Sequence, residues 1–160
     1  RAEILLFNKC YGNQKELIKQ FNEVRQLNTK LSRPVLHITL SLAPGEKLEK
    51  NKMAEICKAC AKNFDFEHNQ FIAIKHTDTR HQHFHIIANR IGFDTKTVSD
   101  SNNYKKIANF CRKMELEYDL QQVLNPRKFL PKELQFKPRL DKRKAVLKEC
   151  IKNRLSQSKN

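Results

Sequence analysis

The strongest constraint on the fold is a pair of β-like runs separated by only a few polar residues. Residues 71–75 read FIAIK and residues 83–91 read HFHIIANRI, and both runs are rich in the side chains that strands favour. Residues 77–82, which lie between them, are all polar. They are too few for a crossover between parallel strands, which takes about a dozen residues. The two runs are therefore predicted to form an antiparallel pair.

Apolar periodicity in the rest of the chain predicts further strands and helices. Alternating or continuous apolar residues indicate strands, and apolar residues spaced three or four apart indicate amphipathic helices. Strands are predicted at residues 2–7, 35–43 and 120–124, and helices at residues 14–30, 49–64 and 102–117. We therefore predict an α+β fold, a two- or three-layer sandwich with helices packed on one or both faces of an antiparallel sheet.

Charge is distributed unevenly along the 160 residues, whose formal net charge is +15. Residues 126–160 hold 12 Lys and Arg against 3 acidic residues, and residues 1–125 hold 20 against 14. We predict one folded domain at residues 1–125 and a basic, partly helical extension at residues 126–160. Such a balance indicates a polyanionic partner, most often nucleic acid, although ribosomal, membrane-surface and heparin-binding proteins share it.

The five cysteines indicate a reducing compartment, because their number is odd and no secretory signal accompanies them. No apolar run approaches the roughly 20 residues that a membrane-spanning helix needs. We therefore expect a cytoplasmic protein. Cys57 and Cys60 form a lone CxxC on the apolar side of a helical pattern. No second pair follows at zinc spacing, so core packing is preferred over metal or redox chemistry.

Four of the six histidines fall within ten consecutive residues, HTDTRHQHFH. In a strand, side chains two residues apart share a face, so His83 and His85 are predicted to point the same way, with His76 opposite them on the paired strand. Three imidazoles on one face can bind a divalent ion and leave positions open for substrate oxygens. Asp78 is a candidate to orient one of the rings, and His81 is a further donor nearby. Alternating histidines are often plain surface residues, but this number beside an aspartate favours a metal site.

The same segment resembles the third motif of the conjugative relaxases, a family of plasmid mobilisation nucleases. Residues 76–90, HTDTRHQHFHIIANR, match the pattern His-x-Asp-x-x-x-x-His-x-His-x-x-x-Asn. Residues 37–46, HITLSLAPGE, resemble the second motif of that family, in the expected order. The resemblance covers about residues 2–91 and is expected to continue to residue 124. The basic tail takes no part in it.

This resemblance implies an enzyme that nicks and rejoins single-stranded transfer-origin DNA. Relaxases attack with a tyrosine, leaving a 5′-phosphotyrosyl link and a free 3′-OH, while a metal at the His-hydrophobe-His element polarises the scissile phosphate. It implies that His76, His83 and His85 bind a divalent metal, Mg or Mn in function, with Zn, Ni or another divalent ion also able to bind. The predicted catalytic residues are Asp78 and His81, and the predicted DNA-binding residues are His37, Ser41, Arg80, Asn89 and Arg90.

The sequence departs from the family pattern at the position of the nucleophile. In this family the tyrosine lies near the N-terminus, ahead of the second motif, and only Tyr11 precedes His37 here. We expect the nucleophile to lie upstream of Arg1, with Tyr11 as the alternative within the sequence. Tyr104 and Tyr118 fall on the apolar stripe of a predicted helix and are expected in the core.

Other interpretations of the sequence stay open. A replication-initiator or transposase nuclease would share the metal element and differ in its DNA target. A non-catalytic basic DNA-binding module would hold a structural ion at the same histidines. The relaxase interpretation further implies a bacterial cytoplasmic location and accessory mobilisation proteins as partners.

Overall fold

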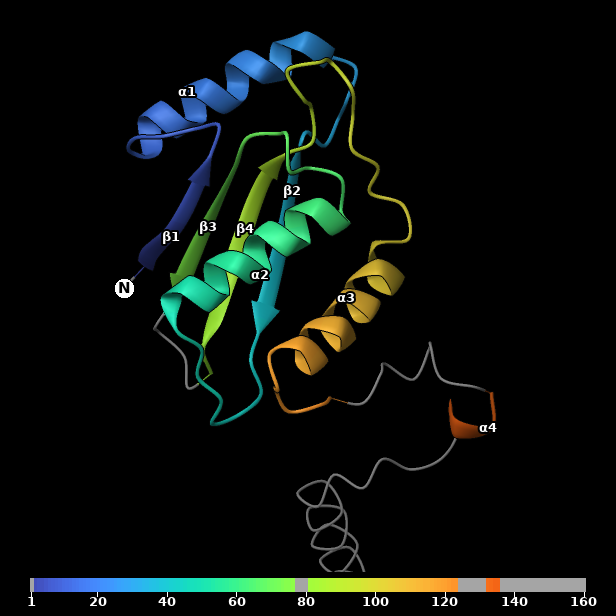
Figure 1. Ribbon diagram of the computed structural model, residues 1–160. Helices are drawn as coiled ribbons and strands as arrows, with labels where there is room; N and C mark the ends of the chain where they lie inside the picture. The colour runs from blue at the N-terminus through green and yellow to red at the C-terminus, as the bar shows by residue number, and fades with distance from the viewer. Residues whose placement is uncertain (1, 77–80, 124–131, 136–160) are drawn as a thin grey trace, which may run out of the picture. The chain divides into compact units, whose positions relative to one another are not determined.

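The computed structural model describes residues 2–76, 81–123 and 132–135. The chain divides into two compact units, residues 1–124 and 125–160. In the second unit the structure describes the short helix α4 (Lys132–Gln135). The first unit is a four-stranded antiparallel sheet with three helices (Figure 1). The predicted α+β architecture is confirmed.

The strands lie in the order β1-β3-β4-β2, and each is antiparallel to its neighbours. Their bounds are β1 (Ala2–Asn8), β2 (Val35–Ser41), β3 (Phe71–His76) and β4 (His83–Asn89). The antiparallel pairing of β3 with β4 is thus confirmed. Because β3 and β4 are central, the backbone of each is hydrogen-bonded to a neighbouring strand on both sides.

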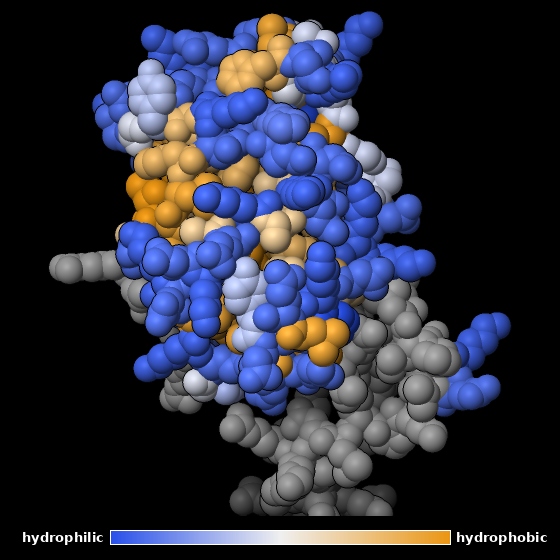
Figure 2. Space-filling view, viewed as in Figure 1, coloured by the Kyte–Doolittle hydropathy of each residue, from blue (hydrophilic) through white to orange (hydrophobic). Residues whose placement is uncertain are grey.

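Two helices, α2 (Lys50–Asn63) and α3 (Asn103–Glu117), cover one face of the sheet, which we call the core face (Figure 1). Its strand residues include Ala73, Phe84 and Ile86, which form one cluster with buried residues of both helices. Seen from this side, the surface is mainly hydrophilic with small separate hydrophobic patches (Figure 2). Most apolar side chains of α2 and α3 therefore point inward, as their sequence periodicity predicts, whereas Tyr104 and Leu116 of α3 are exposed.

The opposite face carries His76, His83 and His85, and we call it the histidine face. Helix α1 (Gln14–Arg25) covers the part of this face that is remote from the histidines. The chain continues as a 3₁₀ turn at Gln26–Asn28, so the regular helix is shorter than the predicted 14–30. No helix among the described residues is both long enough and apolar enough to cross a membrane.

Helix α1 begins at a capping box. The Asn13 side chain accepts hydrogen bonds from the backbone N–H groups of Lys15 and Glu16, and the Glu16 carboxylate accepts one from Asn13 N–H. These contacts satisfy donors that the first helical turn leaves unpaired. Gly12 precedes the cap with φ of +97°, a conformation that a side chain would strain.

Two predicted features near α3 are wrong. Residues 120–123 form no strand, because the backbone N–H groups of Gln121 and Val123 donate to the carboxylates of Glu46 and Glu115 instead of to a strand. Residue 124 lies outside the described residues. Tyr104, which is predicted in the core, is 80% exposed in the first turn of α3.

The cysteine pair lies in the core. Cys57 and Cys60 are fully buried in α2, and all described cysteines are free thiols. Burial raises the pKa of the Cys57 thiol to about 12 and raises that of Cys60 as well. A thiol of this kind is neither a good nucleophile nor a good metal ligand at neutral pH, because both roles need the thiolate.

Candidate metal centre

Three histidine side chains converge where β3 and β4 meet at one end of the sheet. His76 is the last residue of β3 and pairs directly with His83, the first residue of β4. His85 lies two residues further along β4, on the same face. One nitrogen from each ring can be chosen so that all three lie within 4.8 Å of one another. The structure therefore brings together the three residues that the sequence predicts as metal ligands.

Phe84 fixes which face the histidines occupy. It stands between His83 and His85, is 1% exposed and belongs to the core cluster. A slip of one residue in the pairing of β4 would expose Phe84 and bury both imidazoles. Exposing a phenylalanine costs about 2 kcal/mol, and burying unpaired polar rings adds to that cost. The hydrophobic residue inside the motif thus determines the direction of the two ligands.

The three imidazoles form a donor set that fits a divalent ion. All three side chains are half-buried, and their ring centroids are 4.7 to 5.6 Å apart. Three protein ligands leave coordination positions for substrate oxygens, as in catalytic rather than structural sites. Imidazole nitrogens suit Zn²⁺, Ni²⁺ and related ions, whereas Mg²⁺ prefers oxygen.

The backbone before β4 contacts one ligand ring. Nδ1 of His83 lies 3.2 Å from the carbonyl oxygen of His81. A carbonyl can only accept a hydrogen bond, so Nδ1 of His83 is the donor and its Nε2 keeps the lone pair that a metal needs. The His81 side chain is exposed. Asp78 and Arg80 lie outside the described residues, so their predicted roles stay predictions.

Strand β2 brings a further layer of polar side chains beside β4. Nε2 of His37 lies 2.8 Å from Nδ1 of His85, and Oγ1 of Thr39 lies 3.0 Å from the same atom. Ser41 is opposite His83 in the register of the two strands. His37 and Ser41, predicted to bind DNA, therefore lie at the histidine cluster. The contact of Thr39 is missing from the sequence-based prediction, although its place between His37 and Ser41 puts it on the same face.

Asn89 and Arg90, the other two predicted DNA-binding residues, lie inside the protein. The Asn89 amide donates to the carbonyl oxygen of Phe21 and to Oε1 of Gln70, and its oxygen accepts from Ile91 N–H. Arg90 donates to two backbone carbonyls and to Asp100. These bonds give both side chains a role in the fold. A direct contact with DNA stays a prediction for them.

None of the three tyrosines lies at the histidine cluster. Tyr11 is 73% exposed and follows the far end of β1, because Ala2 pairs with His76 whereas Asn8 pairs with Phe71. Six residues at about 3.3 Å each place that end roughly 20 Å from the cluster. Tyr104 belongs to the first turn of α3, which covers the core face, and Tyr118 follows the last residue of that helix and donates its hydroxyl to Glu55.

An apolar groove adjoins the cluster on the histidine face. It encloses about 740 Å³ between α1 and the sheet, and its walls include the exposed side chains of Ile4, Ile18 and Val35. Aliphatic residues dominate its lining, so the groove contributes shape and apolar surface beside the histidines rather than charge.

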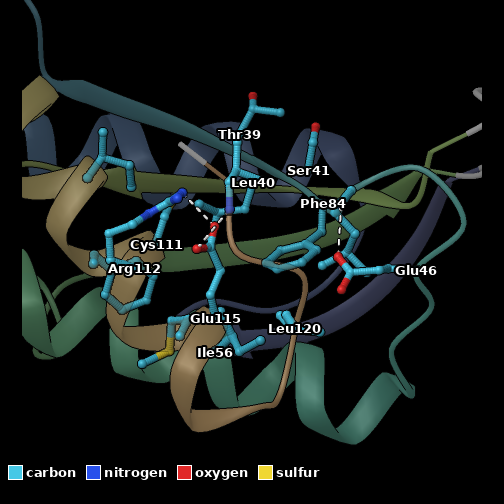
Figure 3. A pocket seen from close by; sticks show the side chains of 16 residues that line it. Thr39, Leu40, Ser41, Glu46, Ile56, Phe84, Cys111, Arg112, Glu115 and Leu120 are labelled. Carbon is cyan, nitrogen blue, oxygen red and sulfur yellow. Dashed lines mark hydrogen bonds and ion pairs between the residues drawn. The ribbon is translucent and has the colours of Figure 1, made fainter. Parts of the chain in front are cut away.

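A second, smaller pocket lies on the opposite side of β2. Figure 3 shows Thr39 and Ser41 projecting away from it, while Leu40 and Phe84 point into it beside α3. It has a volume of about 220 Å³ and a mostly apolar lining, with an ion pair between Arg112 and Glu115 at its rim. The hydroxyls of β2 therefore belong to the histidine face and not to this pocket.

Comparison with known proteins gave one match. A family model described as "Relaxase: MobA/VirD2-like, nuclease domain" matches residues 1–120. Searches of the curated proteins and of the solved structures each gave no match. The matched segment contains all four strands, the three large helices and every histidine of the cluster.

Proposed function

The chain belongs to the MobA/VirD2-like relaxase family, and we propose that it nicks and rejoins one strand of transfer-origin DNA through a phosphotyrosyl intermediate. The observation that carries this proposal is the convergence of His76, His83 and His85 on one face of the sheet within the matched domain. The net charge of +15 supports a polyanionic substrate.

The three histidines would hold a divalent ion, and Asp78 and His81 are the proposed proton-handling residues. When bound, the ion would supply positive charge against the oxygens of the scissile phosphate. Attack by the tyrosine oxygen forms a bond to phosphorus and breaks the bond to the 3′ oxygen, which takes up a proton. Because the phosphodiester energy is kept in the protein–DNA bond, the reverse reaction rejoins the strand.

The DNA would lie across the histidine face. His37 and Ser41 border the cluster there and are proposed to contact the strand near the scissile phosphate, together with Arg80. Asn89 and Arg90 would act by holding the end of β4 in place. Accessory mobilisation proteins are proposed as further partners.

We place the nucleophile in a segment that precedes Arg1 in the whole protein. Ala2 pairs with His76, so the chain enters the sheet directly beside the cluster. Residues just upstream would therefore start within reach of the bound phosphate. Tyr11 follows the opposite end of the same strand, which argues against it as the attacking group.

Removal of single histidines tests the metal centre. His83→Ala and His85→Ala should each abolish Mn²⁺ binding in calorimetry, because each removes one of three protein ligands. His81→Ala is the matched control, since the contact of His81 with His83 is made by its backbone carbonyl, which the substitution keeps. Equal losses of affinity in His81→Ala and His85→Ala would show that the ligand assignment is wrong.

Covalent capture of DNA tests the nucleophile. Incubated with Mn²⁺ and a single-stranded origin oligonucleotide, residues 1–160 should bind the DNA without forming an adduct that survives denaturing electrophoresis. A longer protein that includes the upstream segment should form the adduct, and one of its added tyrosines should be essential.

Tyr11→Phe separates the two candidates for the nucleophile, because it keeps the ring and deletes only the hydroxyl. An adduct formed by residues 1–160 that disappears in Tyr11→Phe would identify Tyr11 as the nucleophile. An adduct that persists in that variant would mean that a residue other than Tyr11 attacks the phosphate.

A further inference from the structure

We propose that Thr39 is a positioning residue of the metal centre, and that its hydroxyl holds the ring of His85 so that Nε2 faces the ion. The inference rests on the metal site proposed above. It adds a third strand to that site, because Thr39 belongs to β2 whereas the three ligands belong to β3 and β4.

The sheet register makes the contact between Thr39 and His85 a direct one. Thr39 is the residue of β2 opposite His85 on β4. The backbone bonds from Leu42 to Gln82 and from Arg90 to Pro34 identify the hydrogen-bonded pairs of these strands, which alternate with non-hydrogen-bonded pairs. Thr39 and His85 fall in a non-hydrogen-bonded pair, where side chains approach most closely. The 3.0 Å contact is therefore set by the backbone.

The chemistry at Nδ1 of His85 determines which nitrogen is left for a metal. Thr39 Oγ1 and His37 Nε2 both lie within hydrogen-bond distance of that atom. A hydroxyl oxygen and an imidazole nitrogen can each accept a hydrogen bond, so Nδ1 of His85 can carry the proton and donate it. Nε2 of His85 then keeps its lone pair for the ion.

The ring of His83 is also oriented through a hydrogen bond from its Nδ1 atom, but here the acceptor is a backbone group. Its Nδ1 donates to the carbonyl oxygen of His81, which cannot donate in return. Two neighbouring ligand rings would thus both present Nε2, one fixed by the backbone and one by a side chain of β2. Of these two contacts, a substitution can remove only the one that the Thr39 side chain makes.

Metal binding by three variants tests the proposal. Thr39→Val keeps the shape of the side chain and removes the hydroxyl, so it should weaken Mn²⁺ binding about tenfold in calorimetry. Thr39→Ser should restore most of the affinity. Ser41→Ala, the matched control, removes the neighbouring hydroxyl of the same strand face and should change affinity less than Thr39→Val. The thermal midpoint of the metal-free protein should stay unchanged in all three variants.

The tautomer of His85 gives a second measurement that needs no metal. Long-range ¹H–¹⁵N NMR spectra of the metal-free protein at alkaline pH should show His85 protonated at Nδ1. In Thr39→Val the signal should shift toward the mixture of tautomers seen for a free imidazole. Protonation at Nε2 in the unaltered protein would overturn the proposal.

The possible failures of the two proposals are distinguishable. If the unaltered protein binds Mn²⁺ and Thr39→Val binds it equally well, the role of Thr39 is wrong and the metal centre stands. If the unaltered protein binds no Mn²⁺, Ni²⁺ or Zn²⁺, the metal centre itself is wrong and the role of Thr39 falls with it.

Discussion

At the scale of single residues, Asn89 shows how a motif residue can serve the fold. It is 1% exposed and connects β4 to α1 and to the segment before β3 through its amide. Asn89→Ala should lower the free energy of unfolding by about 2–4 kcal/mol, because it leaves buried backbone groups without partners. Urea denaturation followed by circular dichroism measures this change.

Asn28 offers a matched control for Asn89. It is a partly exposed asparagine whose amide donates to the Thr97 hydroxyl. Asn28→Ala should change the free energy of unfolding by no more than about 0.5 kcal/mol. A stable Asn89→Ala protein with weakened DNA binding would instead support the predicted contact between Asn89 and DNA.

At the scale of elements, α1 depends on its capping box. Asn13→Ala removes the acceptor for two N–H groups of the first turn. The expected loss is about 1 kcal/mol in the free energy of unfolding, measured by thermal or urea denaturation. Metal affinity should not change, because α1 covers the part of the histidine face remote from the cluster.

Asn22 is the matched control for Asn13, since it is an exposed asparagine within the same helix. Asn22→Ala should leave stability unchanged or raise it slightly, because alanine has the higher helix propensity. Equal losses in Asn13→Ala and Asn22→Ala would mean that the cap contributes little.

At the scale of the whole molecule, net charge should govern the affinity for DNA. Binding of single-stranded DNA should weaken with salt, with a slope of about −0.7 in log–log form for each phosphate neutralised. Removing residues 139–160 deletes 8 Lys and Arg against 2 acidic residues and should make the slope shallower. Fluorescence anisotropy across a salt series measures it.

The same deletion should leave the metal centre intact, because every histidine of the cluster lies in the first unit. An unchanged salt slope would show that the tail makes no phosphate contacts. Loss of Mn²⁺ binding in the shortened protein would show that the tail stabilises the first unit. A change in the salt slope of DNA binding would then reflect altered folding as well as lost phosphate contacts.

The sequence predicts the histidine cluster well because the cluster depends on residues that lie close together in the chain. The alternation of His83, Phe84 and His85 determines a face, and the short polar connection forces His76 to lie opposite. The three large helices and strands β1 and β2 follow from periodicity in the same way, with ends that differ from the predicted ones by at most five residues.

Contacts between distant segments could not be predicted from the sequence. Nothing near residues 35–41 indicates that β2 pairs with β4, so the contact of Thr39 with His85 could not be inferred. The role of Asn89 depends on where Phe21 lies, which is a property of the packed helix. Residues 120–123 have strand-like composition, but carboxylates accept the N–H groups of Gln121 and Val123, and the carbonyl oxygen of Glu115 accepts that of Leu120. Tyr104 continues the apolar stripe of the predicted helix, but it is 80% exposed in the first turn of α3.

His76 and His83 face each other at the end of the β3–β4 hairpin where the connection joins the two strands, so the ligands lie on the strands and not in the connection. The strands hold the ligands, so the spacing of the rings is independent of how many residues join them. Loop-closure entropy rises slowly, by only about 0.6 kcal/mol for each doubling of length. The coordination geometry should therefore tolerate a change in the length of this connection, whereas the proton-handling roles proposed for Asp78 and His81, which belong to the connection, should depend on its length.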